Sequence, residues 1–177
     1  MSERLIIITG ASRGIGASLA YELNTKFNDK TTFLLIARDQ SKLDEVKDEM
    51  KSKLATSSQN IINTLSLDFS QHMKVEQVLD ILTKMIKGHS AFNQLFVFYN
   101  HGTLKLSPLE NIANKVNDEF QINVTSVWIL LTAIRQMFPL NSTPIQFHVN
   151  ISSLLATKVF KYFSVYCTSN LKLEYQI

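Results

Sequence analysis

The chain contains few cysteines, glycines and prolines, and the scarcity of each excludes some classes of protein. Cys167 is the single cysteine, so an intramolecular disulfide is impossible and a reducing compartment such as the cytoplasm is expected. With five glycines and three prolines, the chain shows no low-complexity tract and no linker. Its Lys and Arg residues are scattered and its net charge is only +3, so the clustered basic surface that nucleic acid requires is missing.

Long apolar runs are also missing. Leu5–Ile8 form an apolar run that is too short for the core of a signal peptide. Val127–Leu131 fall far short of the length that spans a bilayer. We therefore expect a cytoplasmic protein that uses neither membrane nor nucleic acid. A length of 177 residues fits one domain with a full hydrophobic core.

Short apolar segments alternate with helical patterns along the chain. Continuous apolar segments are typical of strands that are covered on both faces. Such strands are predicted at Leu5–Thr9, Thr32–Ala37, Ile61–Leu67, Gln94–Tyr99 and Gln146–Ile151. Helical spacing of apolar residues predicts helices at Leu43–Leu54, Met73–Ile86 and Phe120–Phe138. Alternation of strand and helix indicates a doubly wound α/β fold with a parallel sheet.

A glycine-rich turn, Gly10-Ala11-Ser12-Arg13-Gly14-Ile15-Gly16, follows the first predicted strand. Gly10 permits a tight turn, Gly14 lets the backbone approach a ligand, and Gly16 lets the following helix pack against the strand. The helix that begins after this turn offers N–H groups and a partial positive charge to an anion. Between a strand and a helix, such a turn predicts a site for the pyrophosphate of a nicotinamide dinucleotide. The alternative is a glycine-rich turn without a ligand.

The end of the second predicted strand bears on the choice of dinucleotide. Ala37-Arg38-Asp39 lie about 20 residues beyond the glycines, where a carboxylate suits a ribose 2′-hydroxyl and an arginine suits a 2′-phosphate. Arg38, helped by Arg13, therefore predicts NADPH, because a guanidinium can bind a phosphate with two hydrogen bonds. Two alternatives stay open: Asp39 can serve a 2′-hydroxyl, and Arg38 can be a solvated charge.

This turn, followed by Leu67-Asp68-Phe69, resembles the short-chain dehydrogenase/reductase family. Asn123 sits where the family keeps a helical asparagine, and Ser153 ends the fifth predicted strand where the family keeps its catalytic serine. Tyr166 follows Ser153 by thirteen positions, which is the family's usual spacing. The resemblance covers essentially the whole chain. It is greatest to the sepiapterin reductase group, through Phe33-Leu34-Leu35-Ile36-Ala37-Arg38 and Val149-Asn150-Ile151-Ser152-Ser153-Leu154.

The resemblance implies a fold, a cofactor and a reaction. The fold is a Rossmann-like doubly wound parallel sheet in three α/β/α layers, forming a single NAD(P)-binding domain over residues 1–177 and lacking the last strands of the family fold. The activity is NADPH-dependent reduction of a small-molecule carbonyl compound, such as the side-chain ketone of a pterin in tetrahydrobiopterin synthesis, by a homodimer. The implied cofactor-binding residues are Gly10, Ser12, Arg13, Gly14, Ile15, Gly16, Arg38, Asp68, Phe69, Asn100 and Gly102.

The implied catalytic residues are Ser153, Tyr166 and Asn123, with Asn170 at the usual lysine position. Tyr166 would protonate the carbonyl oxygen, Ser153 would stabilise charge on that oxygen, and Asn123 would hold a water. A lysine at the position of Asn170 would lower the pKa of the tyrosine, since a unit charge at 4 Å is worth about 4 kcal/mol at an effective dielectric of 20. A neutral Asn170 leaves this set incomplete.

Asn170 and the last residue, Ile177, support a second hypothesis. The chain would then be a catalytically impaired or fragmentary relative that binds dinucleotide or dimerises without turnover. His101 replaces a small residue of the family near the cofactor, and either a functional histidine or a loop histidine without a special role fits the sequence. The four histidines and the single cysteine have no metal-ligand spacing, so no metal site is predicted.

Overall fold

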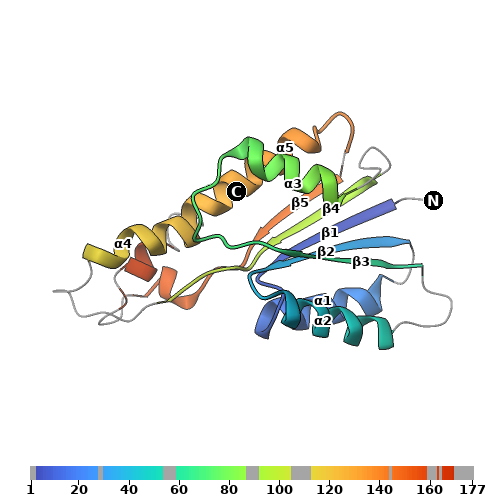
Figure 1. Ribbon diagram of the computed structural model, residues 1–177, viewed down its shortest axis with the longest axis horizontal. Helices are drawn as coiled ribbons and strands as arrows, with labels where there is room; N and C mark the ends of the chain where they lie inside the picture. The colour runs from blue at the N-terminus through green and yellow to red at the C-terminus, as the bar shows by residue number, and fades with distance from the viewer. Residues whose placement is uncertain are drawn as a thin grey trace.

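A computed structural model describes residues 3–27, 30–53, 59–86, 92–104, 113–143, 145–158, 163 and 165–169. In these residues, five parallel strands form one sheet with helices on both faces (Figure 1). The strands are β1 (Glu3–Thr9), β2 (Thr31–Ala37), β3 (Ile61–Ser66), β4 (Phe92–Tyr99) and β5 (Ile145–Asn150). The five predicted strands are confirmed, with ends that differ by one or two residues.

The strand order is β3-β2-β1-β4-β5, which places the first strand in the centre of the sheet. The chain builds outward from β1 to β3 on one side and then returns to add β4 and β5 on the other side. The connections after β1 and β4 therefore leave the sheet in opposite directions. In open parallel sheets this switch point, at the carboxyl ends of the strands, is where ligands bind.

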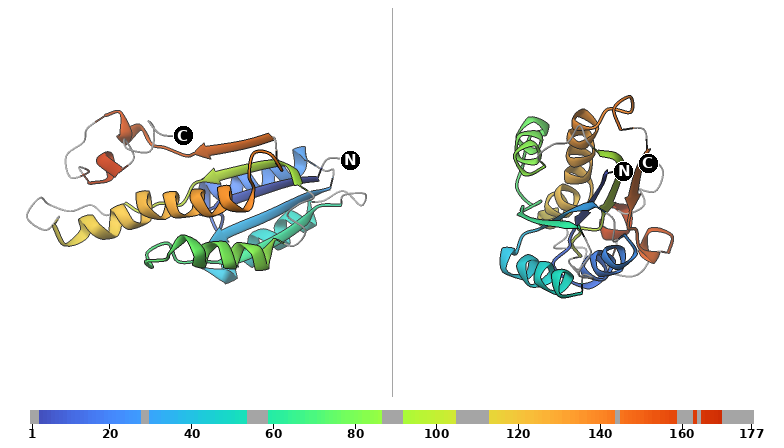
Figure 2. Two further views of the ribbon diagram at one scale, coloured as in Figure 1. Left: turned by 90° about the horizontal axis from the view of Figure 1, so that it is seen from above. Right: turned by 90° about the vertical axis from the view of Figure 1, so that its right-hand side faces the viewer.

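Helices cover both faces of the sheet, which gives three layers (Figure 2). The helices α1 (Gly14–Lys26) and α2 (Gln40–Ser52) pack on one face, and α3 (Val75–Met85) and α5 (Ser126–Met137) pack on the other. Leu5 and Ile7 face the layer of α3 and α5, whereas Ile6 and Ile8 face α1 and α2. All four side chains are fully buried, which explains why β1 is a continuous apolar run.

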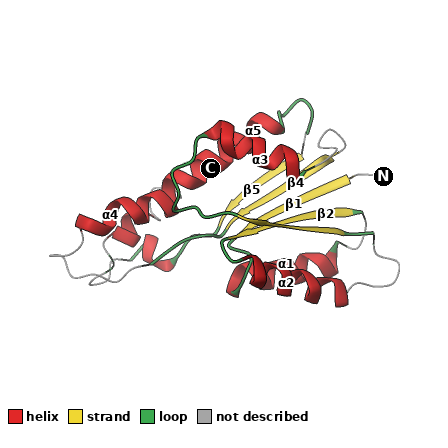
Figure 3. Cartoon of the chain, in the orientation of Figure 1, coloured by secondary structure: helices red, strands yellow, loops and turns green. Residues whose placement is uncertain are grey.

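One long helical rod runs beside the sheet (Figure 3). It consists of α4 (Ala113–Phe120), the π-helical turn η3 (Gln121–Thr125) and α5 in unbroken succession. The prediction that this helix begins at Phe120 was wrong, because the polar residues of α4 carry no continuous apolar pattern. In η3 the backbone N–H of Ser126 donates to the Gln121 carbonyl, five residues back, instead of to Ile122. Turns of this kind often occur at functional sites.

In the described sheet the two edge strands are β3 and β5. Ile145 and Phe147 on β5 are 44% and 51% exposed, and the Phe147 ring stacks on Phe96 of the neighbouring strand. Within the described part of the chain, no helix has the length and apolar character needed to cross a membrane.

Candidate functional site

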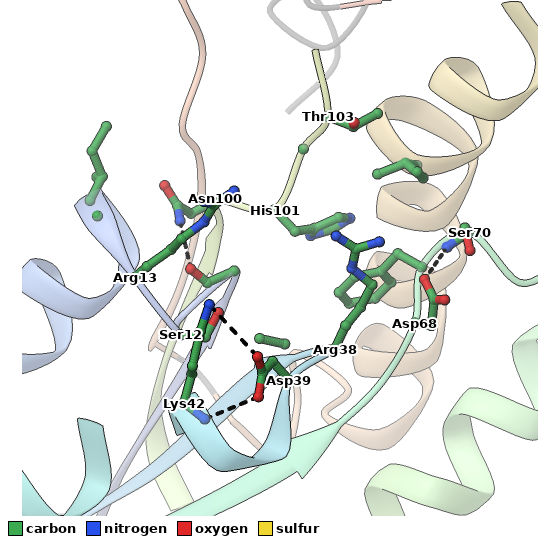
Figure 4. A pocket seen from close by; sticks show the side chains of 17 residues that line it. Ser12, Arg13, Arg38, Asp39, Lys42, Asp68, Ser70, Asn100, His101 and Thr103 are labelled. Atoms are coloured by element: carbon green, nitrogen blue, oxygen red, sulfur yellow. Dashed lines mark hydrogen bonds and ion pairs between the residues drawn. The ribbon is translucent and has the colours of Figure 1, made fainter. Parts of the chain in front are cut away.

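A cleft of about 710 Å³ opens at the carboxyl ends of the strands, at the switch point between β1 and β4 (Figure 4). Its volume lies in the range of small-molecule and cofactor pockets. The turn after each of four strands contributes to its lining, and η3 adds Ile122. The lining residues are Gly10, Ser12, Arg13, Gly14, Ile15, Ala37, Arg38, Asp39, Lys42, Asp68, Phe69, Ser70, Asn100, His101, Gly102, Thr103 and Ile122. Every residue predicted to bind the cofactor is in this set except Gly16.

The glycine turn wraps one end of the cleft. Gly10 and Gly14 have φ values of +64° and +55°, in the left-handed region that favours glycine. A Cβ atom on Gly16 would lie 2.3 Å from the Gly10 carbonyl oxygen, so this glycine is required for helix packing and does not line the cleft. A Cβ atom on Gly14 would meet nothing within 4 Å, so the backbone there faces open space. The roles that the sequence predicted for the three glycines fit these positions.

The N-terminus of α1 is suited to an anion. Arg13 occupies the N-cap position, its side chain forms no capping hydrogen bond, and the first turn of the helix contains no acidic residue. The first N–H groups of the helix therefore keep their hydrogen-bonding capacity, and its partial positive charge is not compensated by a nearby carboxylate. Because Gly14 keeps the approach open, a pyrophosphate fits this position.

Asn100 joins the ends of β1 and β4 beneath the glycine turn. Its backbone N–H donates to Thr9 Oγ1 at 2.9 Å, and its side-chain Nδ2 donates to the carbonyls of Thr9 and Gly10, each at 3.3 Å. This side chain thus holds the turn against the neighbouring strand. Its predicted position at the cofactor site agrees with the lining of the cleft.

The turn after β2 brings two basic side chains and one acidic side chain to the cleft: Arg38, Lys42 and Asp39. Asp39 caps α2, where Oδ1 accepts a hydrogen bond from the Lys42 backbone N–H at 3.1 Å. Its Oδ2 lies 3.8 Å from Lys42 Nζ, in an exposed ion pair. The carboxylate of Asp39 is therefore engaged with α2, while the Arg38 guanidinium lies toward the cleft (Figure 4).

Asp68 follows β3 and lines the same cleft. Its Oδ1 accepts a hydrogen bond from the Ser70 backbone N–H at 3.0 Å. That bond lowers the pKa of Asp68, and nearby Arg38 adds to the effect, so the side chain is an ionised acceptor at neutral pH. Phe69 beside it is 5% exposed and forms part of the wall.

Asn123 and Tyr166 meet at a second, smaller cavity of about 50 Å³. This cavity shares Asn100, His101 and Gly102 with the main cleft and is therefore continuous with its wall. Asn123 is 5% exposed. Its Oδ1 accepts from the Thr103 N–H at 2.8 Å, and its Nδ2 donates to the Thr103 carbonyl at 3.0 Å.

Ser153 stands apart from that pair. Ser153 follows β5 and caps a short 3-10 helix, η4 (Leu154–Ala156), where its Oγ accepts from the Leu155 N–H at 3.2 Å. It is not among the residues that line either cavity, although its neighbours Asn150 and Ile151 line the smaller one. Asn170 lies outside the described residues.

Comparison with known proteins identifies this arrangement. The chain matches the family model described as short chain dehydrogenase over residues 4–173. The chain belongs to the short chain dehydrogenase family. A solved short chain dehydrogenase from Shigella flexneri, complexed with NADP, superposes with a TM-score of 0.81 and 22% identity, covering 98% of this chain and 69% of that one.

Two curated relatives are similar to this chain over most of its length. Sepiapterin reductase from Rattus norvegicus is 30% identical over 167 residues, which cover 91% of this chain and 62% of the rat protein. The NADP-dependent 3-hydroxy acid dehydrogenase from Schizosaccharomyces pombe is 28% identical over 170 residues, 96% of this chain and 61% of the relative. The chain thus spans somewhat less than two thirds of the length of these relatives.

His101 lines both cavities and is partly buried. Both ring nitrogens lie within hydrogen-bonding distance of a hydroxyl, so the side chain is tied to two other segments of the chain. Nδ1 lies 2.7 Å from Thr9 Oγ1, and Nε2 lies 2.8 Å from Ser126 Oγ. The ring stacks on Phe69 with centroids 3.8 Å apart. Burial lowers the pKa of His101 to about 3, so it is neutral, although hydrogen bonding to the Ile122 carbonyl acts in the opposite direction.

The sequence did not identify several lining residues, namely Lys42, Ser70, Thr103 and Ile122. Lys42 lies one helical turn beyond Arg38, so its place in the first turn of α2 was a usable signal. Thr103 and Ile122 reach the cleft only because the rod α4-η3-α5 packs beside the end of β4, which no local pattern records. Among the described residues, no group of three or more His, Cys, Asp and Glu side chains could hold a metal ion.

Proposed function

We propose that this chain is an NADPH-dependent carbonyl reductase of the sepiapterin reductase type. Its substrate is a small carbonyl compound, with the side-chain ketone of a pterin in tetrahydrobiopterin synthesis as the leading candidate. The observation that carries the proposal is the cleft in which an uncapped helix N-terminus and Arg38 face the same space. Residues 1–177 are taken as a single NAD(P)-binding Rossmann domain that works as a cytoplasmic homodimer.

The preference for NADPH rests on the charges after β2. Arg38 and Lys42 both line the cleft, and two adjacent cations favour a 2′-phosphate over a hydroxyl. Asp39 is the residue that would serve a 2′-hydroxyl, but its carboxylate caps α2 and pairs with Lys42. The NADP-dependent relative from fission yeast and the NADP complex of the Shigella structure support the same cofactor.

Three further regions of the cleft each contact a different part of the dinucleotide. The N–H groups after Gly14 bind the pyrophosphate, because they are uncapped and uncompensated. Asp68 is an ionised acceptor for a donor on the adenosine half. Asn100 and Gly102 line both cavities, so they lie between the dinucleotide and the residues that act on the substrate.

The chemistry is transfer of hydride, which the reduced nicotinamide supplies when it is bound. Tyr166 donates a proton to the carbonyl oxygen of the substrate. For Ser153 to donate a hydrogen bond to the same oxygen, its side chain has to turn from the η4 cap toward the cavity that its neighbours Asn150 and Ile151 line. Asn123 holds a water in the smaller cavity, whose volume of about 50 Å³ exceeds what one water needs. Asn170 offers no charge to assist Tyr166, so we expect slow turnover.

A second function is favoured by Asn170, which carries no charge. In this alternative the chain binds dinucleotide, or dimerises, without turnover. The two functions make the same prediction for cofactor binding and opposite predictions for catalysis. Binding and turnover are therefore tested separately.

Cofactor binding is tested by fluorescence titration of the purified chain with NADPH and with NADH. Arg38→Ala should weaken NADPH binding by about tenfold to a hundredfold, because hydrogen bonds to charged groups contribute about 1.5–3 kcal/mol. Its NADH affinity should change little. Lys84→Ala, at an exposed ion pair on α3, is the matched control and should leave both affinities unchanged. Equal affinity of the unaltered chain for NADPH and NADH would contradict the preference.

Turnover is tested by the loss of nicotinamide absorbance with sepiapterin or a simple diketone as substrate. Under the first function the chain shows slow turnover that Tyr166→Phe abolishes and Asn170→Lys accelerates, while NADPH affinity stays the same in each. Under the second function the unaltered chain binds NADPH and shows no turnover. Rapid turnover that Asn170→Lys does not increase would remove the argument from the missing charge.

A further inference from the structure

The π-turn in the helical rod leaves one carbonyl without its usual helical partner. Because the Ser126 N–H donates to Gln121, the Ile122 carbonyl cannot receive that N–H. The hydroxyl of Ser126 replaces it, with Oγ donating to the Ile122 carbonyl at 2.7 Å. This bond uses the single hydrogen that the hydroxyl possesses.

The ring of His101 must then act as a donor toward Ser126. Nε2 lies 2.8 Å from Ser126 Oγ, whose hydrogen is already committed to Ile122. A hydrogen bond between them therefore requires the hydrogen to be on Nε2. The chain of donors runs from His101 Nε2–H to Ser126 Oγ–H to the Ile122 carbonyl.

The other side of the ring leads to the same tautomer. Thr9 Oγ1 accepts the backbone N–H groups of Asn100 at 2.9 Å and His101 at 3.2 Å, which occupy both of its lone pairs. Its one hydrogen has two acceptors within reach, the Phe98 carbonyl at 3.2 Å and, nearer, His101 Nδ1 at 2.7 Å. With the ring hydrogen on Nε2, Nδ1 carries a lone pair and can accept this hydrogen.

From the π-turn, hydrogen bonds continue to the helical segment that carries Tyr166. Asn123 is part of η3, and its Nδ2 donates to Ser169 Oγ at 3.2 Å. Ser169 Oγ in turn donates to the Tyr166 carbonyl at 3.0 Å. Both Asn123 and Ser169 are buried, so these bonds are not exposed to competition from bulk water.

We propose that His101 is a positioning residue, which joins the end of β1 to the π-turn and thereby sets the place of Asn123 and Tyr166 relative to the dinucleotide. It does so as the neutral Nε2–H tautomer, held between Thr9 and Ser126 and stacked on Phe69. This role rests on the proposed function only for its effect on turnover. The arrangement of hydrogen bonds is a property of the chain itself.

The tautomer is measured by nitrogen NMR of the chain labelled with ¹⁵N in its histidine side chains. His101, assigned by its disappearance in a His101→Phe variant, should show a protonated Nε2 and an unprotonated Nδ1 throughout pH 5–8. The exposed His72 provides the comparison spectrum. A protonated Nδ1, or titration of His101 within pH 5–8, would overturn the proposal.

Two variants separate hydrogen bonding from packing. His101→Phe keeps a ring against Phe69 but has no nitrogen, whereas His101→Gln keeps an N–H near the position of Nε2. We expect His101→Phe to increase hydrogen exchange of the Thr103 amide about tenfold, the effect of losing about one buried hydrogen bond. We expect His101→Gln to restore exchange to within about threefold of the unaltered chain. His72→Phe is the matched control and should change nothing.

The effect of His101 on catalysis is measured separately, by steady-state kinetics. In a chain that turns over, His101→Phe should lower kcat about tenfold with less than a twofold change in KM for NADPH, and His101→Gln should recover most of the loss. Unchanged amide exchange and unchanged kcat in His101→Phe would overturn the proposal. A chain that binds no dinucleotide refutes the proposed function, yet the tautomer and the Thr103 exchange still decide the role of His101. If neither variant folds, the tautomer in the unaltered chain decides it, with His101 assigned by elimination from substitutions of the other three histidines.

Discussion

At the scale of single residues, two partly buried histidines stand out, His101 and His148. His148 Nδ1 lies 2.9 Å from the hydroxyl of Tyr99, whose side chain is 1% exposed. Burial, helped by nearby Arg135, lowers the pKa of His148 to about 4, and burial raises the pKa of Tyr99. Tyr99 is thus the donor and a neutral His148 the acceptor. Both histidines are part of hydrogen-bonded interiors that require them to be uncharged.

These two residues predict how stability depends on pH. Their folded pKa values of about 3 and about 4 lie below the value near 6.5 of an unfolded histidine, so between these values the unfolded chain binds more protons. The two neutral histidines therefore contribute their full share of stability above pH 7. The free energy of unfolding should fall by a few kcal/mol, on the order of magnitude, as the pH drops from about 6.5 to 4.

The measurement is urea unfolding at pH 7.5 and pH 5. His101→Gln should show a smaller drop in the free energy of unfolding than the unaltered chain, because one of the two protonation sites is gone. His72→Gln, at an exposed position, should show the full drop. A free energy of unfolding that is the same at both pH values would mean that neither histidine is kept neutral by burial.

At the scale of elements, the junction between β1 and α1 combines two different demands on glycine. Gly16 is needed because a Cβ atom at this position would lie 2.3 Å from the Gly10 carbonyl oxygen. Gly14 is needed because its φ of +55° is costly for other residues and because its exposed side must admit a ligand. Substitutions at Gly14 and Gly16, only two positions apart, can therefore separate an effect on ligand binding from an effect on helix packing.

Gly16→Ala should destabilise the fold, since its Cβ would meet backbone atoms at 2.3 Å and at 2.9 Å. We expect a loss of about 3 kcal/mol, at the upper end of the cost of overpacking. Gly14→Ala should lower the free energy of unfolding by about 1–2 kcal/mol, because of its positive φ value. Among folded molecules, Gly14→Ala should weaken NADPH binding more than Gly16→Ala does. Urea unfolding and fluorescence titration measure the two effects.

Ser18→Ala supplies the control for this pair of substitutions, because Ser18 is an exposed residue of the same helix. It should leave affinity unchanged and should stabilise the helix slightly. If Gly16→Ala were as stable as Ser18→Ala, then α1 would not pack against the turn as closely as the structure has it.

At the scale of the whole molecule, the cleft depends on the order of strands. Its walls come from the turns after β1, β2, β3 and β4 and from η3, which are separated by up to about a hundred residues in sequence. The order β3-β2-β1-β4-β5 brings these turns to one end of the sheet. A ligand that spans the cleft therefore contacts segments that separate on unfolding, and its binding should stabilise the chain as a unit.

NADPH at a hundred times its Kd should add about 2.7 kcal/mol to the free energy of unfolding. For a chain of this size that gain corresponds to a rise in Tm of roughly 5 to 11 °C. Thermal unfolding with NADPH, with NADH and with 2′,5′-ADP measures it. 2′,5′-ADP carries the 2′-phosphate without the nicotinamide, so a rise with it exceeding that with 5′-ADP would locate the preference at Arg38 and Lys42. No rise with any of them, at millimolar concentration, would contradict a dinucleotide site.

The extent of prediction from sequence differs between the fold and the site. The strands were identified because burial on both faces requires continuous apolar residues, as in β1 and β2. The glycine turn was identified because positive φ values and close approach leave few alternatives to glycine. The start of α4 was missed because its polar sequence has no continuous apolar pattern, and the burial of His101 was missed because the partners Thr9 and Ser126 are distant in the chain.

The sequence by itself determined the alternation of strands and helices, the phosphate-binding turn and the family resemblance, because these depend on residues that are near one another along the chain. Tertiary structure alone decided three further matters. It engaged Asp39 with α2 and left Arg38 toward the cleft, it brought Asn123 and Tyr166 to one small cavity, and it enclosed His101 between β1 and the π-turn. Each depends on which elements pack together, and hydrogen bonds between distant segments leave no periodic trace in the sequence.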